Sequence, residues 1–160
     1  ARNDSIDKIR WYEIDPCYVF HPLNAYTQGN KIIAHMMQFE VAPLFPNVDG
    51  SRSDPSKANA RLCEWIIDLS EGGGITRRYL DDITGEFPRL DERFSGNENR
   101  FGYYAASTIA DGGLGFDAIA HQDLQQDRRT LFELKDGDKT GEPVFVPKSQ
   151  NSNEGEGDGI

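Results

Sequence analysis

Hydrophobic and polar positions along the chain form short apolar runs separated by turn residues, which indicates β-strands almost throughout. Apolar runs cover residues 17–20, 31–39 and 61–69. Three glycines at 72–74 follow the last of these runs and supply the backbone freedom of a turn into residues 75–80, which predicts a hairpin. Because no long segment has helical spacing, the pattern predicts an all-β protein.

The second half of the chain continues this pattern. An aromatic-rich strand is expected at residues 100–108, and a second hairpin is expected to join residues 116–124 to residues 129–134. Residues 47–59 are polar and contain Pro55, so they are predicted to form an exposed loop.

The two hairpins belong to a repeat of about 55 residues, a period made of short strands that is typical of a β-propeller blade. Asp68-Leu69 recurs as Asp123-Leu124, and Thr84-Gly85-Glu86 recurs as Thr140-Gly141-Glu142. Since equivalent positions in successive blades converge on the propeller axis, Glu86 and Glu142 are expected to be equivalent in space.

Composition and charge narrow the class of protein. The length of 160 residues suits one domain, and a formal net charge of −10 with scattered arginines argues against a nucleic-acid partner. No apolar run approaches the roughly 20 residues of a membrane span. Contact with a membrane surface stays open, although nothing in the sequence points to it. Cys17 and Cys63 lie in apolar runs and are expected to be buried free thiols, which favours a reducing, cytoplasmic location.

The two ends of the sequence suggest a part of a longer chain. There is no initial Met, and the chain stops at Ile160 directly after an acidic, glycine-rich run. We therefore interpret residues 1–160 as a partial β-propeller domain that is truncated at both ends.

His21 is the strongest candidate for chemistry. It ends an apolar run and precedes Pro22, so we expect it either to hydrogen-bond inside a core or to offer a neutral imidazole to a metal. A metal-bound histidine usually donates its other ring N–H to a carboxylate, and Glu86 and Glu142 are candidates for that role. The plainer alternative is that both carboxylates accept backbone N–H groups in loops.

The other two histidines are weaker candidates. His35 lies within an apolar run and favours a strand histidine with satisfied hydrogen bonds, whereas His121 stands beside Gln122 and Asp123 and is expected to be exposed to solvent. No pair of histidines has the close spacing of a zinc site, and no motif for a catalytic nucleophile is present.

These residues, together with their surroundings, resemble the carotenoid cleavage oxygenase family (the retinal pigment epithelial membrane protein family), which includes lignostilbene-type dioxygenases. The matching segments, in order along nearly the whole chain, are residues 11–13, 20–26, 86–94, 100–103, 141–147 and 157–159. The resemblance implies that the chain is the C-terminal part of a seven-bladed β-propeller, a few blades long, with Fe(II) held on the axis by four histidines.

The resemblance also implies roles for single residues. His21 matches one iron ligand, while Glu86 and Glu142 match glutamates that hydrogen-bond ligand histidines without touching the iron. The other three ligand histidines have no counterpart, since one would follow Ile160 and two would precede Ala1. No residue of this chain matches a catalytic acid, base or nucleophile.

The implied function is that of an Fe(II)-dependent dioxygenase. Such an enzyme uses O₂ to cleave a carbon–carbon double bond of an apolar conjugated substrate: a carotenoid, an apocarotenoid or a stilbene-like molecule. This chain alone is expected to be inactive, because it holds one ligand of four.

Two other functions stay open. One is a non-catalytic β-propeller segment that binds a partner and buries His21 as a structural residue. The other is a small β-sandwich that binds calcium through the acidic tail at Glu154, Glu156 and Asp158, although that run lacks the spacing of a calcium loop.

Overall fold

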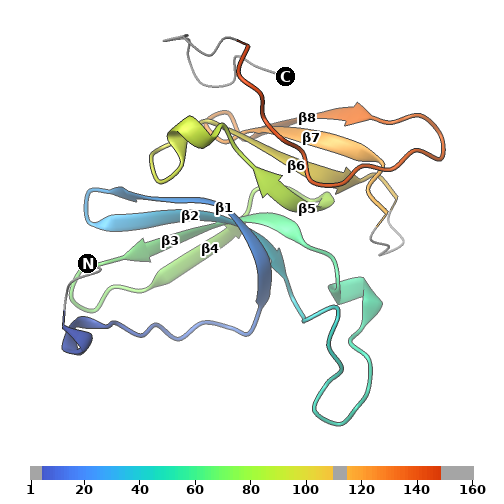
Figure 1. Ribbon diagram of the computed structural model, residues 1–160. Coiled ribbons are helices and arrows are strands. Elements are labelled where there is room, and N and C mark those ends of the chain that lie inside the picture. Colours follow the sequence, from blue (N-terminus) through green and yellow to red (C-terminus); the bar gives the residue numbers. More distant parts are fainter. Residues whose placement is uncertain (1–4, 110–114, 149–160) are drawn as a thin grey trace.

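A computed structural model describes residues 5–109 and 115–148 and contains two four-stranded antiparallel sheets (Figure 1). The first sheet consists of β1 (Tyr18–Gln28), β2 (Lys31–Phe39), β3 (Arg61–Asp68) and β4 (Ile75–Tyr79). The second consists of β5 (Thr84–Arg89), β6 (Phe101–Ser107), β7 (Ala118–Asp123) and β8 (Arg128–Glu133). Three short 3₁₀ turns lie outside the sheets, at Ile6–Lys8, Pro55–Lys57 and Glu92–Phe94.

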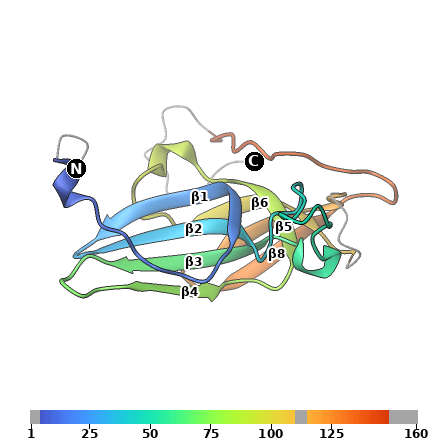
Figure 2. The same ribbon diagram turned by 90° about the horizontal axis from the view of Figure 1, so that it is seen from below.

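Each sheet is a meander, because strands that follow one another in the sequence are also neighbours in the sheet (Figure 2). The all-β prediction and both hairpins are thereby confirmed. The predicted loop at 47–59 is also found, interrupted by one 3₁₀ turn. The acidic run after residue 153 lies outside the described residues. Within the described residues, none of the helices has the length and apolar character that crossing a bilayer requires.

The first strand is longer than the apolar run predicts. Pro22 has no N–H for the sheet, yet β1 continues past it to Gln28 and turns into β2 at Gly29, where φ is +58°. The ladder accommodates Pro22 by two register shifts, one on each side of it. A proline therefore lies within the strand at the place where the strand is irregular.

The repeat in the sequence is also a repeat of hydrogen bonds. The Leu69 N–H donates to the Asn30 carbonyl at 2.9 Å, and the equivalent Leu124 N–H donates to the Arg100 carbonyl at 2.7 Å. Both leucines follow an aspartate whose carboxylate caps the next turn. The two sheets are therefore two consecutive blades of a β-propeller.

The core lies between the two sheets and joins side chains of unequal size. The buried core residues are Leu23, Met37, Phe39, Ala60, Leu62, Leu90, Tyr104, Ala106, Ala118 and Ala120. Those from β1, β2 and β3 are large, whereas those from β6 and β7 are mostly alanines. Gly102 extends this fit, because a Cβ there would come within 2.7 Å of Leu23 Cδ2. Small positions on one blade thus receive large side chains from the other.

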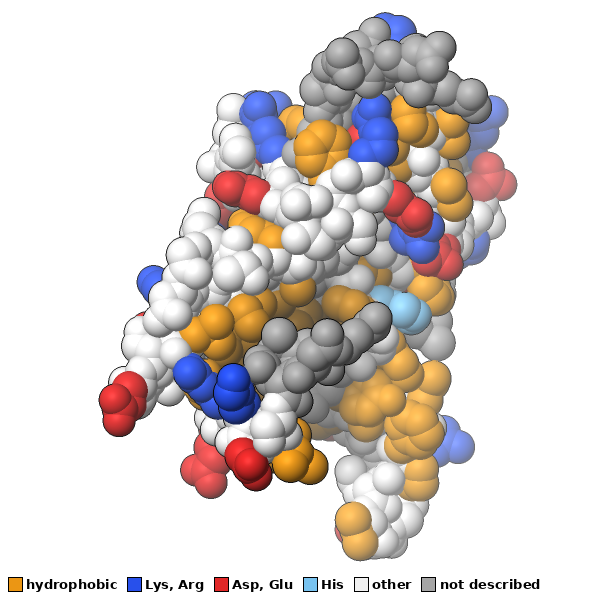
Figure 3. Space-filling view, turned by 60° about the vertical axis from the view of Figure 1, so that its left-hand side comes forward, with side chains coloured by type: hydrophobic (Ala, Val, Ile, Leu, Met, Phe, Trp, Pro, Cys, Tyr) orange, Lys and Arg blue, Asp and Glu red, His pale blue; other side chains and the backbone are white. Residues whose placement is uncertain are grey.

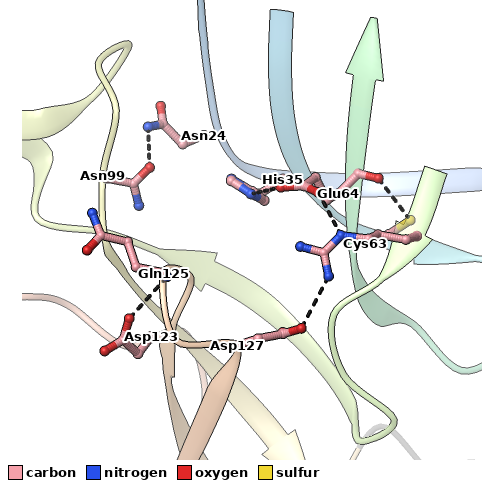
Figure 4. Close-up of polar contacts among 9 residues, drawn as sticks. Asn24, His35, Cys63, Glu64, Asn99, Asp123, Gln125 and Asp127 are labelled. Atoms are coloured by element: carbon pink, nitrogen blue, oxygen red, sulfur yellow. Dashed lines mark hydrogen bonds and ion pairs between the residues drawn. The ribbon is translucent and has the colours of Figure 1, made fainter. Parts of the chain in front are cut away.

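Polar contacts also connect the blades (Figure 4). The Asn24 amide of β1 donates to Asn99 Oδ1 at 2.7 Å, in the loop before β6. Arg78 of β4 donates to Glu64 at 2.8 Å and to Asp127, in the turn between β7 and β8, at 3.2 Å. These contacts join the two blades, whose first strands, β1 and β5, carry the candidate site.

Candidate functional site

His21 lies at the irregular part of β1. Val19 pairs with Gln38, and Pro22 pairs with Met36. Two residues of β1, Phe20 and His21, therefore lie opposite a single residue of β2, Met37, and this irregularity is a β-bulge. A bulge re-aims a side chain away from the strict in–out alternation of a strand, and His21 is the second of these two residues. Its side chain is 46% exposed, so of the two alternatives that the sequence leaves open, a histidine enclosed in a core is not what this structure shows.

Glu86 is the partner of His21. The Nδ1 atom of His21 lies 2.6 Å from Oε2 of Glu86, whose side chain is only 6% exposed. The same oxygen accepts the N–H of Phe87 at 2.7 Å. Burial raises the pKa of the Glu86 carboxyl, and the hydrogen bonds from Phe87 and His21 oppose that shift.

Aromatic rings surround the imidazole. The His21 ring is 5.3 Å from that of Phe87 and 6.2 Å from that of Phe20. Phe87 in turn makes an edge-on contact with the buried Phe116 at 5.8 Å. In the space-filling view, a histidine reaches the surface beside a group of hydrophobic side chains (Figure 3). The imidazole of His21 thus has two aromatic neighbours besides Glu86.

The contact between His21 and Glu86 is the arrangement expected of a metal-binding histidine and the carboxylate that supports it. When Nδ1–H donates to a carboxylate, the lone pair of a neutral imidazole is left on Nε2. No hydrogen bond reaches His21 Nε2 within residues 5–109 and 115–148. The same residues contain no group of three or more histidine, cysteine or acidic side chains arranged to hold a metal. His21 therefore fits as a single donor, with further ligands needed from elsewhere.

Glu142 does not join this pair. It lies outside the strands, 51% exposed, and its Oε1 accepts a hydrogen bond from Arg89 at 3.3 Å. The backbone bonds near the two glutamates are also out of register by one residue. The Gly85 N–H donates to the Ala60 carbonyl, whereas the donor to the Phe116 carbonyl is Thr140, which the repeat matches with Thr84. The side-chain contacts of Glu86 and Glu142 differ in this structure, and their equivalence in space stays a prediction.

His35 is a strand histidine, as predicted, but its hydrogen bonds are not all satisfied, because its buried Nδ1 has no partner within the described residues. It is 2% exposed in β2, and its Nε2 lies 3.3 Å from Glu64 Oε2 (Figure 4). Burial lowers its pKa against the opposing effect of Glu64. The sequence gives no sign of Glu64 as its partner, because the two residues meet only through the register of β2 and β3.

Two other expectations from the sequence are wrong in part. His121 is not free in solvent, because its ring stacks on Tyr103 at 5.0 Å and burial lowers its pKa. The thiol of Cys63 is buried, which raises its pKa to about 11, but Cys17 is only partly buried because it precedes β1. Both cysteines are free thiols.

Comparison with known proteins identifies the family of this chain. The family model described as retinal pigment epithelial membrane protein matches residues 1–160. The chain belongs to this family. Members that resemble it include isoeugenol monooxygenase of Pseudomonas putida, 32% identical over 93% of this chain and 33% of that protein. Carotenoid cleavage oxygenase of Mycobacterium tuberculosis is also 32% identical, over 99% of this chain and 32% of that protein.

Solved structures of the family have the same fold. Lignostilbene dioxygenase of Pseudomonas brassicacearum superposes with a TM-score of 0.86 at 27% identity, over 99% of this chain and 35% of that one. Cobalt-substituted Synechocystis ACO gives a TM-score of 0.74 at 26% identity, over 89% of this chain and 29% of that one. The chain thus spans about a third of the length of the relatives it matches.

Proposed function

We propose that the full-length protein is an Fe(II)-dependent dioxygenase that uses O₂ to cleave a carbon–carbon double bond of a carotenoid, apocarotenoid or stilbene-like substrate. The family supports this proposal, as do relatives named lignostilbene dioxygenase and carotenoid cleavage oxygenase. The relative named isoeugenol monooxygenase indicates that the members of this family share oxygenase chemistry while their substrates differ.

The observation that carries the proposal is the contact between His21 and Glu86. His21 would hold the iron through Nε2, because Nδ1 is already occupied by the carboxylate 2.6 Å away. The iron, once bound, would supply open coordination positions for O₂. A relative described as cobalt-substituted supports a divalent metal site in this fold.

The residues of this chain would orient and shield the metal. Glu86 keeps the proton on Nδ1 and adds negative charge beside a neutral ligand. The rings of Phe20 and Phe87 limit water on two sides of the imidazole and suit an apolar conjugated substrate. Glu142 would hydrogen-bond a different ligand histidine, outside the described residues, after giving up Arg89.

A cytoplasmic location belongs to the same proposal. Cys17 and Cys63 are unpaired, and free thiols are typical of proteins in reducing compartments.

Metal analysis combined with a cleavage assay tests the function. The purified full-length protein, incubated with a stilbene or an apocarotenoid under ¹⁸O₂, should contain about one iron per chain and release labelled aldehyde or ketone products. A protein that binds no divalent metal would contradict the proposal. So would one that binds iron but cleaves no conjugated alkene of either class.

A further inference from the structure

The backbone of Phe87 is unusual for its place in the fold. Its φ is +57°, in the left-handed region that bulky side chains rarely adopt. Within residues 5–109 and 115–148, Asp127 is the other non-glycine residue with positive φ, and it lies in a turn between strands. Phe87 instead lies inside β5, so its conformation is not that of an ordinary hairpin.

This conformation interrupts the ladder between β5 and β6. Glu86 pairs with Ala105 and Arg89 pairs with Tyr103, so three steps along β5 match two along β6. The N–H of Phe87 donates to the carboxylate of Glu86 at 2.7 Å. Glu86 Oε2 therefore receives two donors at once, the Phe87 backbone and the Nδ1 atom of His21.

The Phe87 side chain holds this backbone in place. Its ring lies 5.3 Å from the His21 ring and 5.8 Å from that of Phe116, which is 4% exposed. The contact with a buried ring anchors Phe87, and the contact with His21 covers one side of the imidazole. The residue thus touches both members of the candidate pair, one through its backbone and one through its ring.

We propose that Phe87 is a positioning residue: its left-handed backbone directs its N–H onto Glu86 and so fixes the carboxylate that orients His21. This inference rests on the proposed function, because it concerns the ligand geometry of the same site. The second glutamate of the repeat cannot use the same arrangement. Pro143 follows Glu142, and proline has no N–H and a φ near −65°.

Two pairs of variants in the full-length protein separate the backbone from the ring. Asn and Thr are both polar and both remove the ring, but Asn tolerates positive φ whereas β-branched Thr does not. The variant Phe87→Asn should bind Fe(II) roughly 10-fold more tightly than Phe87→Thr, at the lower end of the usual effect of contacts to a metal ligand. The Co(II) absorption spectrum should follow the same order, with Phe87→Thr departing further from wild type.

The pair Phe87→Gly and Phe87→Val repeats the test with apolar side chains. If Phe87 only packs, Val retains more contact than Gly and binds iron more tightly; if the backbone positions Glu86, Gly binds more tightly. Phe132→Val, at a ring of β8 that is 68% exposed, is the control and should match wild type. Thermal denaturation checks the fold of each variant. If a variant of one pair fails to fold, the comparison within the other pair still decides the test.

The outcomes are distinct. Tighter binding by Phe87→Asn and Phe87→Gly than by their partners supports the inference, and the reverse order or equal affinities would overturn it while leaving the proposed function intact. A wild-type protein without a metal site would overturn both.

Discussion

His21 lies at a break in the ladder of its strand, and Glu86 lies directly before one. His21 shares a bulge with Phe20 in β1, and Glu86 precedes the register shift at Phe87 in β5. The 2.6 Å contact between His21 Nδ1 and Glu86 Oε2 thus joins two sheets at places where their strands are irregular.

The role of Glu142 gives a prediction about one residue. Glu142→Gln in the full-length protein should weaken iron binding or activity by roughly 10- to 100-fold, because the substitution removes a charge that supports a ligand histidine. Iron titration and steady-state rates measure the effect. Glu92→Gln, an exposed carboxylate that also pairs with Arg89, is the matched control. Wild-type values for both variants would mean that Glu142 only pairs with Arg89.

Sequence reasoning reaches the site in part. It identifies His21 and Glu86 because a histidine beside a proline and a repeated Thr-Gly-Glu stand out in the sequence. It misses Phe87, since a positive φ at a phenylalanine leaves no sign in the residue type. It does not decide how far His21 is buried, because the bulge at this residue depends on the register with β2.

At the scale of elements, the fold is more predictable than the site. Both hairpins follow from apolar runs and turn residues, and seven of the eight strands in the described residues occupy expected regions, whereas the pattern does not predict β5 (Thr84–Arg89) as a strand. The extension of β1 through Pro22 is the main departure, because a bulge can absorb a proline that pattern alone treats as a break. Local signals define strands well, whereas irregular pairing is decided by the neighbouring strand.

The fit between the two blades gives a prediction at this scale. Gly102→Ala should destabilise the protein by about 1–3 kcal/mol, because the new Cβ would lie 2.7 Å from Leu23 Cδ2 and Leu23 is 4% exposed. Chemical denaturation measures the change. Gly74→Ala, in open space without a positive φ, is the control and should shift stability by less than about 0.5 kcal/mol. Equal stabilities of the two variants would show that the blades are packed loosely.

At the scale of the whole molecule, buried histidines couple stability to pH. Burial lowers the pKa of His35 and His121 below the ordinary value of 6.5. Below that pH the unfolded chain therefore takes up protons on these residues that the folded chain does not, and stability falls as the pH is lowered. The carboxylates whose pKa values are lowered, such as Asp91 and Asp123, lose their contribution at a lower pH, below about 4.

This linkage is a testable prediction. The midpoint temperature of thermal unfolding should decrease as the pH is lowered from about 7.5 to about 5.5. The variant His121→Gln should show a smaller decrease, because one of the two histidines no longer titrates. Calorimetry at a series of pH values measures it. An unchanged slope in His121→Gln would mean that His121 has the same pKa in the folded and unfolded chains.

The two blades of this chain contain one defined part of the proposed metal site, the pair of His21 and Glu86. Two inner strands, β1 and β5, lie side by side because the core and the contacts of Asn24 and Arg78 hold the sheets together. In a propeller the remaining blades would bring further inner strands to the same axis. The chain thus supplies one proposed ligand and its carboxylate, and we propose that the other ligands come from the remaining blades of the full-length protein.

Iron content of the full-length protein tests the central proposal most directly. Elemental analysis of wild type, His21→Ala and the control His121→Gln after identical loading with Fe(II) compares a proposed ligand with a histidine that stacks on Tyr103 instead. Wild type and His121→Gln should hold about one iron per chain, while His21→Ala, although folded, should lose nearly all of it. Stoichiometric iron retained by His21→Ala would contradict the assignment of His21 as a ligand.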